Sequence, residues 1–300
     1  MSVGAHFYSS THADVSQLGL VDGSVIFHGG VVDERGELTL DLGPTHHKVP
    51  VSYNAQDMTI SVAGEIFAAD YCEKALGPYL DGRDIVLEAT TLGFAELFCL
   101  TRALIVLGKH TFQITYAEPT RYNRPVGGGE SYALSEIIND YAPIPHSVVD
   151  LSSEEVEAGV FFLGYEQERM ARALEEYQMI SSKMVKVVFG VPAFRAGWEL
   201  NAIVPHLQIL SEHNGFEIAY CSANDPGSAF ESLERTLRSL SNGARMFIAP
   251  IGTKPCGVAT AVFASLYPAE SGILYDHPKK RTKRSFGVHV WHKYIVNVSV

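Results

Sequence analysis

The chain has 300 residues, of which 46% are hydrophobic and 19% are charged, a composition typical of a folded protein with one large domain or two ordinary ones. Its formal net charge of −11 argues against broad binding to duplex nucleic acid, which depends on many Lys and Arg side chains, although a local basic site stays open. The sequence shows no signal-peptide pattern and no apolar run of membrane-spanning length, so we expect a cytoplasmic protein that does not associate with membranes.

The cysteines and histidines do not indicate a metal site or a disulfide framework. Four cysteines stand singly in apolar stretches: Cys72, Cys99, Cys221 and Cys256. We expect them to be small buried residues in a reducing compartment. The 12 histidines are scattered, and no nucleophile motif is present, so we expect neither a metal nor a cofactor and name no catalytic residue.

The first half begins with short β-like runs that are separated by turn residues. Strands are expected at 24–32, 37–43 and 48–54, forming an antiparallel extension of the first sheet. A regular alternation follows, with strands at 57–65, 84–93 and 111–119 and helices at 66–80 and 94–110. The most loop-like stretch is 123–155, in which Gly127–Gly129 are expected to form a hinge.

The second half continues the alternation. Strands are expected at 158–166, 184–192, 216–223, 244–252 and 271–278, and a hairpin-like pair at 286–300. Helices are expected after the first strand and at 197–215, 227–243 and 255–268, with Pro205 kinking or splitting the second of these. Strands alternating with helices of this length predict a mainly parallel sheet with helices on both faces.

Two stretches share one layout, 84–122 and 245–281. Each has an apolar strand, a turn with Thr and Gly, an apolar helix, a second strand, and then an acidic residue and Pro. The likeness fits either a duplication or the convergence of ordinary strand–helix–strand units. We therefore expect an α/β protein of two Rossmann-like halves, with 1–150 holding the β extension and the first half and 151–300 the second.

The turn Gly252-Thr253-Lys254 is the strongest candidate for a ligand contact. The C-terminal ends of parallel strands form a crevice, and helices that begin there point N–H groups at an anion. Gly252 permits a close backbone approach, Thr253 supplies a hydroxyl and Lys254 a charge. Neither a Walker A loop nor a G-x-G-x-x-G motif occurs, which argues against ATPases and classical dinucleotide dehydrogenases. The turn could also be a plain strand-to-helix connection.

The segment "IGTKPCGVATAVFASLYP", followed by "GILYDHP", resembles the G-G-T-K-x-M turn, helix and strand of CARF domains, Rossmann-like sensors of cyclic oligonucleotides. Two such halves in one chain also resemble the related SAVED sensors. The resemblance covers about 184–300, with a weaker echo at 57–122, and Ile251 stands where family members usually carry a second glycine. It implies a nucleotide- or oligonucleotide-binding sensor or regulatory subunit of a bacterial anti-phage defence system, which acts through a separate effector protein.

Further candidates lie on the other predicted rims. A nucleotide-like or phosphorylated small molecule would be contacted by Thr90, Thr91, Gly93, Arg121, Tyr122, Trp198, Gly252, Thr253, Lys254, Lys279, Lys280, Arg281, Lys283 and Arg284. Cations would hold phosphates, while Tyr122 and Trp198 would contact bases. Each group also has a structural interpretation, namely a capped helix start at 90–93, a rigid loop at 121–122, a core anchor at Trp198 and a solvated or docking loop at 279–284.

Two other functions remain open. The protein could be an enzyme acting on a nucleotide or a phosphorylated metabolite, with Glu88, Glu96 or Glu118 as acid–base group and Lys254 as electrostatic stabiliser. It could instead be a structural subunit whose basic loop docks a partner. Under each interpretation, we expect a protein partner or a homo-oligomer.

Overall fold

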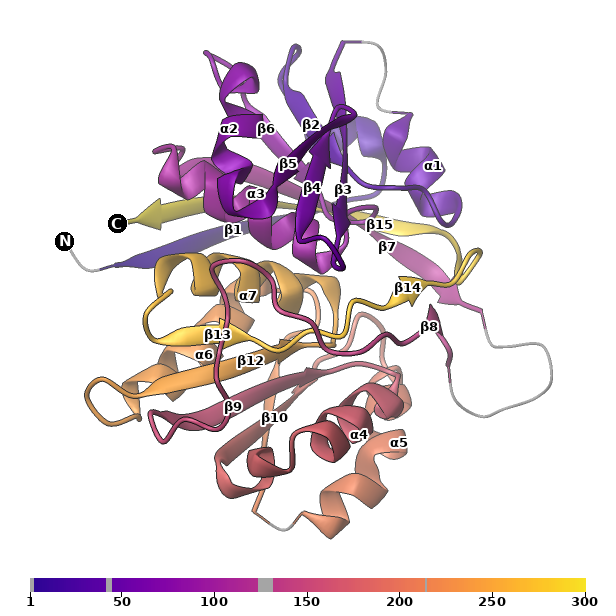
Figure 1. Ribbon diagram of the computed structural model, residues 1–300. Coiled ribbons are helices and arrows are strands. Elements are labelled where there is room, and N and C mark those ends of the chain that lie inside the picture. Colours follow the sequence, from indigo (N-terminus) through magenta and orange to yellow (C-terminus); the bar gives the residue numbers. More distant parts are fainter. Residues whose placement is uncertain (1–2, 42–44, 124–131, 214) are drawn as a thin grey trace. The chain divides into compact units, whose positions relative to one another are not determined.

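The computed structural model describes residues 3–41, 45–123, 132–213 and 215–300 (Figure 1). The chain forms two compact units, unit 1 (1–123 and 280–300) and unit 2 (124–279). This division differs from the expected one at 150/151, because strand β15 (Ser285–Ser299) returns to pair with strands of the first unit. The expected hinge at Gly127–Gly129 lies outside the described residues.

Unit 1 is built on an eight-stranded sheet with the order β1-β15-β7-β6-β2-β3-β4-β5. Its central strands β7, β6, β2 and β3 are parallel, and the flanking pairs are antiparallel. The strands other than β15 are β1 (Gly4–His12), β2 (Val25–His28), β3 (His47–Asn54), β4 (Thr59–Val62), β5 (Glu65–Ala68), β6 (Ile85–Glu88) and β7 (Thr111–Tyr122). The helices are α1 (Glu34–Leu40), α2 (Cys72–Leu76) and α3 (Phe94–Val106).

The strand expected at 37–43 is wrong, because its described part belongs to helix α1. The alternation of apolar and polar residues there predicts a strand, yet the buried residues Arg35, Gly36 and Thr39 follow helical spacing. Leu38, which the strand interpretation would bury, is 41% exposed. The Thr39 hydroxyl donates to the Arg35 carbonyl one turn earlier. Burial of one helical face therefore outweighs the period-two pattern.

The helix expected at 66–80 is also wrong in its first part. Ala63 and Gly64, with φ of 52° and 88°, form a two-residue turn that folds β5 back onto β4. The helix that follows, α2, has only five residues. Local turn chemistry therefore decides the conformation of Ile66 and its neighbours.

The hairpin-like pair expected at 286–300 is a single long strand, β15. A register shift between Val288 and Val290 and a positive φ of 61° at Gly287 mark a bulge that bends the strand without reversing it. Strand β15 lies between β1 and β7 and is antiparallel to both.

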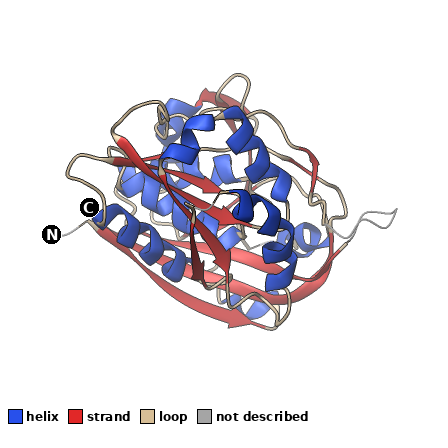
Figure 2. Ribbon diagram, turned by 90° about the horizontal axis from the view of Figure 1, so that it is seen from below, coloured by secondary structure: helices blue, strands red, loops and turns tan. Residues whose placement is uncertain are grey.

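Unit 2 contains a fully parallel five-stranded sheet with the order β11-β10-β9-β12-β13. The strands are β9 (Val156–Leu163), β10 (Met184–Gly190), β11 (Glu217–Cys221), β12 (Arg245–Pro250) and β13 (Ser271–Ile273). Helices α4 (Gln167–Glu176) and α5 (Glu199–Glu212) contact each other, as do α6 (Pro226–Arg238) and α7 (Lys254–Leu266). The two helix pairs lie on opposite faces of the sheet (Figures 1 and 2).

A short ribbon of β8 (Ser135–Ile137) and β14 (Lys279–Lys280) lies where the chain leaves unit 2. Pro205 lies inside α5, which continues through it as one helix. Each helix in the described part of the chain is too short or too polar to cross a bilayer. The expected α/β fold class, with two halves built around parallel strands and with an antiparallel strand near the N-terminus, is confirmed. That strand is β1, whereas the strands expected at 24–32 and 48–54 as an antiparallel extension are β2 and β3, which pair in parallel in the centre of the sheet.

The two similar stretches occupy equivalent positions. In unit 1, β2 leads through α1 to β3 on one side, while β6 leads through α3 to β7 on the other. In unit 2, β9 leads through α4 to β10, while β12 leads through α7 to β13. Each unit therefore has a switch point, which is a pair of neighbouring strands whose connections leave in opposite directions. It lies between β2 and β6 in unit 1 and between β9 and β12 in unit 2. Ligands bind α/β sheets at such points.

Candidate functional site

The switch point of unit 2 is closed by glycine contacts. A Cβ atom on Gly164 would lie 2.9 Å from the carbonyl oxygen of Ile251, and one on Gly252 would lie 3.1 Å from the carbonyl oxygens of Phe162 and Leu163. The loops after β9 and β12 thus approach each other closely through backbone, which Gly252 permits, while its contact with a ligand stays a prediction. Lys254 is the first residue of α7 and is half-buried at this edge.

Thr253 and Trp198 lie at the same edge of unit 2 but make different contacts. The Thr253 hydroxyl donates to the carbonyl of Ala223 at 2.9 Å, so it joins two neighbouring turns. Trp198 precedes α5 at the end of the loop that follows β10, is half-buried, and stacks with the Arg195 guanidinium 5.3 Å from its ring. Trp198 is therefore a rim residue rather than a fully buried core anchor.

A buried ion pair that the sequence did not predict crosses this switch point. Arg169, in the first turn of α4, donates to both carboxylate oxygens of Asp276 at 2.7 and 2.5 Å and to the carbonyl of Ile251 at 3.5 Å. Burial opposes the charge on Arg169, but the attraction of Asp276 outweighs it and raises the pKa of the guanidinium. Because the two charges satisfy each other, the pair offers little net charge to a ligand.

The turn after β6 in unit 1 is satisfied internally. The carboxylate of Glu88 accepts hydrogen bonds from the backbone N–H groups of Thr90 and Thr91, both at 2.8 Å, and from the Thr91 hydroxyl. The Thr90 hydroxyl accepts from the N–H of Ala117, and the Thr91 hydroxyl from the N–H of Gly29. Each threonine is 3% exposed, so these hydroxyls shape the turn and do not face a ligand.

Gly93, at the start of α3, makes room for a carboxylate. A Cβ atom there would lie 2.2 Å from an oxygen of Glu96, whose other oxygen accepts from the Tyr53 N–H at 3.1 Å. Glu118 is 2% exposed and lies 3.0 Å from Nε2 of buried His292. The three carboxylates considered for acid–base catalysis, on Glu88, Glu96 and Glu118, therefore each hold a neighbouring part of unit 1.

The basic run, residues 279–284, contains some side chains that point into unit 1 and others that face solvent. Lys279 is 61% exposed and pairs with Glu136 of β8 at 3.0 Å, both within unit 2. Lys283 is exposed and Arg281 is half-buried. Lys280 and Arg284 point into unit 1, where the Lys280 ammonium donates to the carbonyls of Thr91 and Leu92 at 2.6 and 3.1 Å.

Arg284 joins a second buried arginine and one carboxylate. Arg35 of α1 is 2% exposed, pairs with Asp33 at 2.8 Å and donates to the carbonyl of Ala117 at 3.1 Å. Asp33 also accepts from the Ser285 hydroxyl, and Nε of Arg284 lies 3.9 Å from it. The Arg284 side chain is only 16% exposed, and its Nε lacks an acceptor among the described residues.

These three residues, Arg35, Lys280 and Arg284, form what we call the cation cluster. Burial lowers the pKa of Lys280 to about 8, and the positive charge of Arg284 adds to this effect, while Glu96 and Glu88 oppose it. Burial and the nearby Arg35 likewise lower the pKa of Arg284. The cluster is therefore a region of closely spaced positive charge in which cations repel each other.

Arg121 and Tyr122 end β7, and Tyr122 lies near the cation cluster. Arg121 is exposed and stacks on Phe286, with 5.0 Å between its guanidinium and the ring centre. Tyr122 is half-buried and close enough to Arg35 and Arg284 to affect the pKa of each. The Tyr122 ring thus lies close to Arg35 and Arg284, and its contact with a base stays a prediction.

The candidate residues therefore fall into two groups, one on each unit. Unit 1 holds Thr90, Thr91, Gly93, Arg121, Tyr122, Lys280, Arg281, Lys283 and Arg284, and unit 2 holds Trp198, Gly252, Thr253, Lys254 and Lys279. The four cysteines are buried, as expected. Among the described residues, no three His, Cys, Asp or Glu side chains are grouped as metal ligands.

The charge runs and glycine turns were visible in the sequence, whereas the partners of Arg35 and Arg169 were not. Compared with known proteins, the chain matches no protein-family model, and no curated protein matches its sequence.

Proposed function

We propose that the protein binds a nucleotide-like or phosphorylated ligand and acts as the sensor or regulatory subunit of a larger assembly. The observation that carries this proposal is the cation cluster of unit 1. One buried cation, Arg35, and two half-buried ones, Lys280 and Arg284, converge at a switch point. Asp33 is the carboxylate that pairs with both arginines in the described structure. Burial first, and the neighbouring positive charge second, lower the pKa values of Lys280 and Arg284, and a bound anion would offset both effects.

The surroundings of the cluster favour a phosphate over a carboxylate ligand. Arg284 and Lys280 together can donate several hydrogen bonds, as a phosphoryl group with three oxygens requires. Tyr122 lies close by and supplies a ring on which a base could stack. Unit 2 adds an independent candidate contact at Lys254, because its strand order 3-2-1-4-5 is that of nucleotide-binding Rossmann folds.

The CARF- and SAVED-like role in anti-phage defence belongs to this proposal and rests on the Gly252-Thr253-Lys254 turn. The enzyme alternative has less support, because Glu88, Glu96 and Glu118 each make structural contacts. The protein partner, whether an effector or a second copy, follows from the sensor role.

A binding titration tests the proposal. Fluorescence anisotropy with a short labelled single-stranded oligonucleotide, and its displacement by ATP, should give saturable binding. Arg284→Gln should weaken binding by about tenfold or more, since a hydrogen bond to a charged group is lost from a buried site. Lys283→Gln is the matched control, because Lys283 is exposed in the same basic run.

Two further results decide which unit holds the ligand. If Arg284→Gln and Lys283→Gln bind equally well, the cation cluster is not the site; if Lys254→Ala binds like the natural protein, Lys254 is not a contact. If neither probe binds and mass spectrometry finds no nucleotide released from the denatured protein, the proposed function is wrong.

A further inference from the structure

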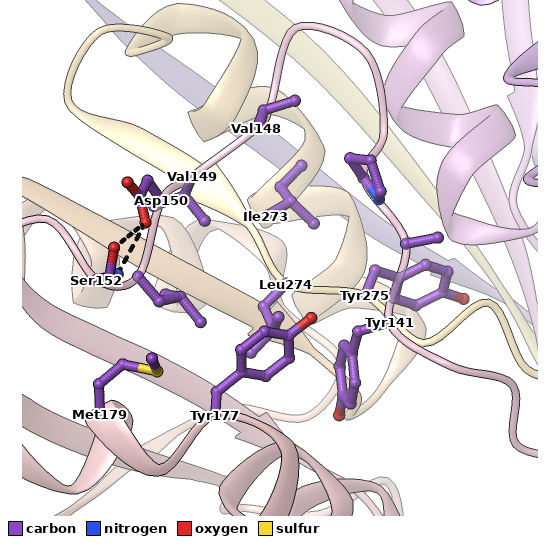
Figure 3. Close-up of a pocket in the computed structure, with 13 residues that line it drawn as sticks. Tyr141, Val148, Val149, Asp150, Ser152, Tyr177, Met179, Ile273, Leu274 and Tyr275 are labelled. Atoms are coloured by element: carbon purple, nitrogen blue, oxygen red, sulfur yellow. Dashed lines mark hydrogen bonds between the residues drawn. The ribbon is translucent and has the colours of Figure 1, made fainter.

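Unit 2 contains a pocket of about 450 Å³ that lies away from the residues predicted from the sequence (Figure 3). Its walls come from the segment 141–152, from the chain just after α4, and from β13 with the residues that follow it. The lining residues are Tyr141, Ala142, Pro143, Val148, Val149, Asp150, Leu151, Ser152, Tyr177, Met179, Ile273, Leu274 and Tyr275. A volume in this range is usual for small-molecule sites.

The pocket exists because an irregular segment lies along the edge strand β13. The N–H of Ile273 donates to the carbonyl of Ser147 at 2.7 Å, and the N–H of Ala142 donates to the carbonyl of Tyr275 at 3.2 Å. These bonds hold residues 142–147, the first part of the segment, against β13 and the chain after it. The rest of the segment, 148–152, supplies further lining residues, together with Leu274, Tyr177 and Met179 (Figure 3).

The walls are aromatic and aliphatic, and part of them is fixed. The hydroxyl of Tyr141 donates to the carbonyl of Arg169 at 2.7 Å, which anchors that ring to α4. The ring of Tyr177 packs edge-on against it, with 5.9 Å between ring centres. At the mouth, Val148 is 59% exposed and Met179 is 38% exposed. A planar apolar group could therefore pack against preformed rings.

The charge of the pocket selects the class of ligand. Its lining contains no Lys or Arg, and its one carboxylate is Asp150. The exposed Asp150 carboxylate accepts hydrogen bonds from the hydroxyl and N–H of Ser152, which together with the nearby charge of Lys183 lower its pKa, so it stays ionised at neutral pH. Burial, with a contribution from Glu176, raises the pKa of Tyr177 to about 12, so that ring stays neutral. The Asp150 charge therefore disfavours phosphates and carboxylates, by a modest factor because solvent screens it and Lys183 offsets part of it.

We propose that this pocket binds a small aromatic molecule that is uncharged or carries an amine. The ligand class differs from the phosphorylated ligand of the cation cluster, and the two sites share no residue. The proposal therefore stands or falls independently of the proposed function.

Three probes with one ring system and different charges test it: indole, tryptamine and indole-3-acetate. Ligand-observed NMR titrations should show saturable binding of indole and tryptamine, with tryptamine several times tighter than indole-3-acetate. Asp150→Asn keeps an acceptor for Ser152 and removes the charge, so it should abolish the difference between tryptamine and indole-3-acetate. Tyr177→Ala should weaken binding of all three by about tenfold, through loss of an aromatic contact.

Tyr220→Ala is the matched control, because Tyr220 is an exposed tyrosine on β11 of the same unit but not in the pocket lining. It should leave all three affinities unchanged. The proposal is overturned if no probe shows saturable binding, if Tyr177→Ala and Tyr220→Ala have the same effect, or if indole-3-acetate binds tightest.

Discussion

Arg35 of unit 1 and Arg169 of unit 2 occupy equivalent places and have different surroundings. Each lies in the first turn of the helix that follows the first strand at a switch point, and each donates to a backbone carbonyl across it. Arg169 makes two short bonds to Asp276. Arg35 shares Asp33 with Ser285 and, at longer range, with Arg284.

Equivalent positions in the fold therefore do not give the two switch points the same electrostatic surroundings. Where a buried arginine has its own carboxylate, the pair closes the switch point and stabilises the fold. Where several cations lie close together and share their carboxylates, as Arg35 and Arg284 share Asp33, a bound anion can offset the repulsion between them. The comparison predicts large effects on stability in unit 2 and charge-dependent effects in unit 1.

The largest effect is expected from breaking the pair in unit 2. Asp276→Asn should lower the free energy of unfolding by about 3–5 kcal/mol, because it leaves the buried Arg169 charge without its partner. Urea unfolding followed by circular dichroism measures this. Asp140→Asn is the control, since Asp140 pairs with Arg172 but has a side chain that is 89% exposed. Similar losses in both variants would contradict the distinction.

The glycines after β2 and β9 also differ in how tightly backbone atoms surround them at the two switch points. A Cβ atom on Gly29 would lie 2.5 Å from the carbonyl oxygen of Thr91 and also too close to two other backbone atoms, whereas Gly164 has one such contact, at 2.9 Å. Overpacking costs about 1–3 kcal/mol, so Gly29→Ala should fall at the upper end of this range and Gly164→Ala at the lower. Thermal unfolding should rank them in that order, and the reverse order would mean that the loop of unit 1 adapts more easily.

Lys280 should give unit 1 an unusual dependence of stability on pH. Its pKa is about 8 in the folded protein against 10.5 in an unfolded chain. Below pH 8 the amine is charged in both states, so the full cost of burying the charge applies. Between pH 8 and 10.5 only the unfolded chain binds the proton, so the free energy of unfolding rises with pH, by on the order of 3 kcal/mol at most.

The matched variant Lys280→Met isolates this effect. Urea unfolding of both proteins between pH 7 and 10 should show that the stability of the natural protein approaches that of the variant as pH rises. Ligand binding at the cation cluster should weaken over the same range, because the amine loses its charge. Parallel stability curves for the two proteins would show that Lys280 is not a buried cation.

Much of the fold could be predicted because hydrophobic periodicity is a local signal. The strands of unit 2 and the apolar helices α3 and α7 follow from it, as does the parallel sheet. The return of β15 to unit 1 could not be predicted, because pairing with β1 depends on residues almost a whole chain apart. The errors at Leu38 and Ile66 arose where helical burial or a two-residue turn outweighed the local pattern.

The sites were less predictable than the fold. The basic run identified Lys280 and Arg284 among five cations, but only the folded chain distinguishes the inward pair from Lys279 and Lys283. The acidic residue before Pro in each repeated stretch marked Asp276, while its partner Arg169 is 107 residues away. The pocket beside β13 left no periodic signal, since the irregular segment 141–152 forms one of its walls.

The smallest effect is expected at Lys279, next in sequence to Lys280. Its ion pair with Glu136 has both side chains about half exposed or more, so solvent screens the attraction and Lys279→Ala should change the free energy of unfolding by about 0.5 kcal/mol or less. Oligonucleotide affinity should also stay within about twofold of the natural protein. A loss as large as that of Arg284→Gln would mean that the outward cations of the basic run, and not the buried cluster, attract the ligand. That result would move the binding site from the interior of unit 1 to the exposed loop.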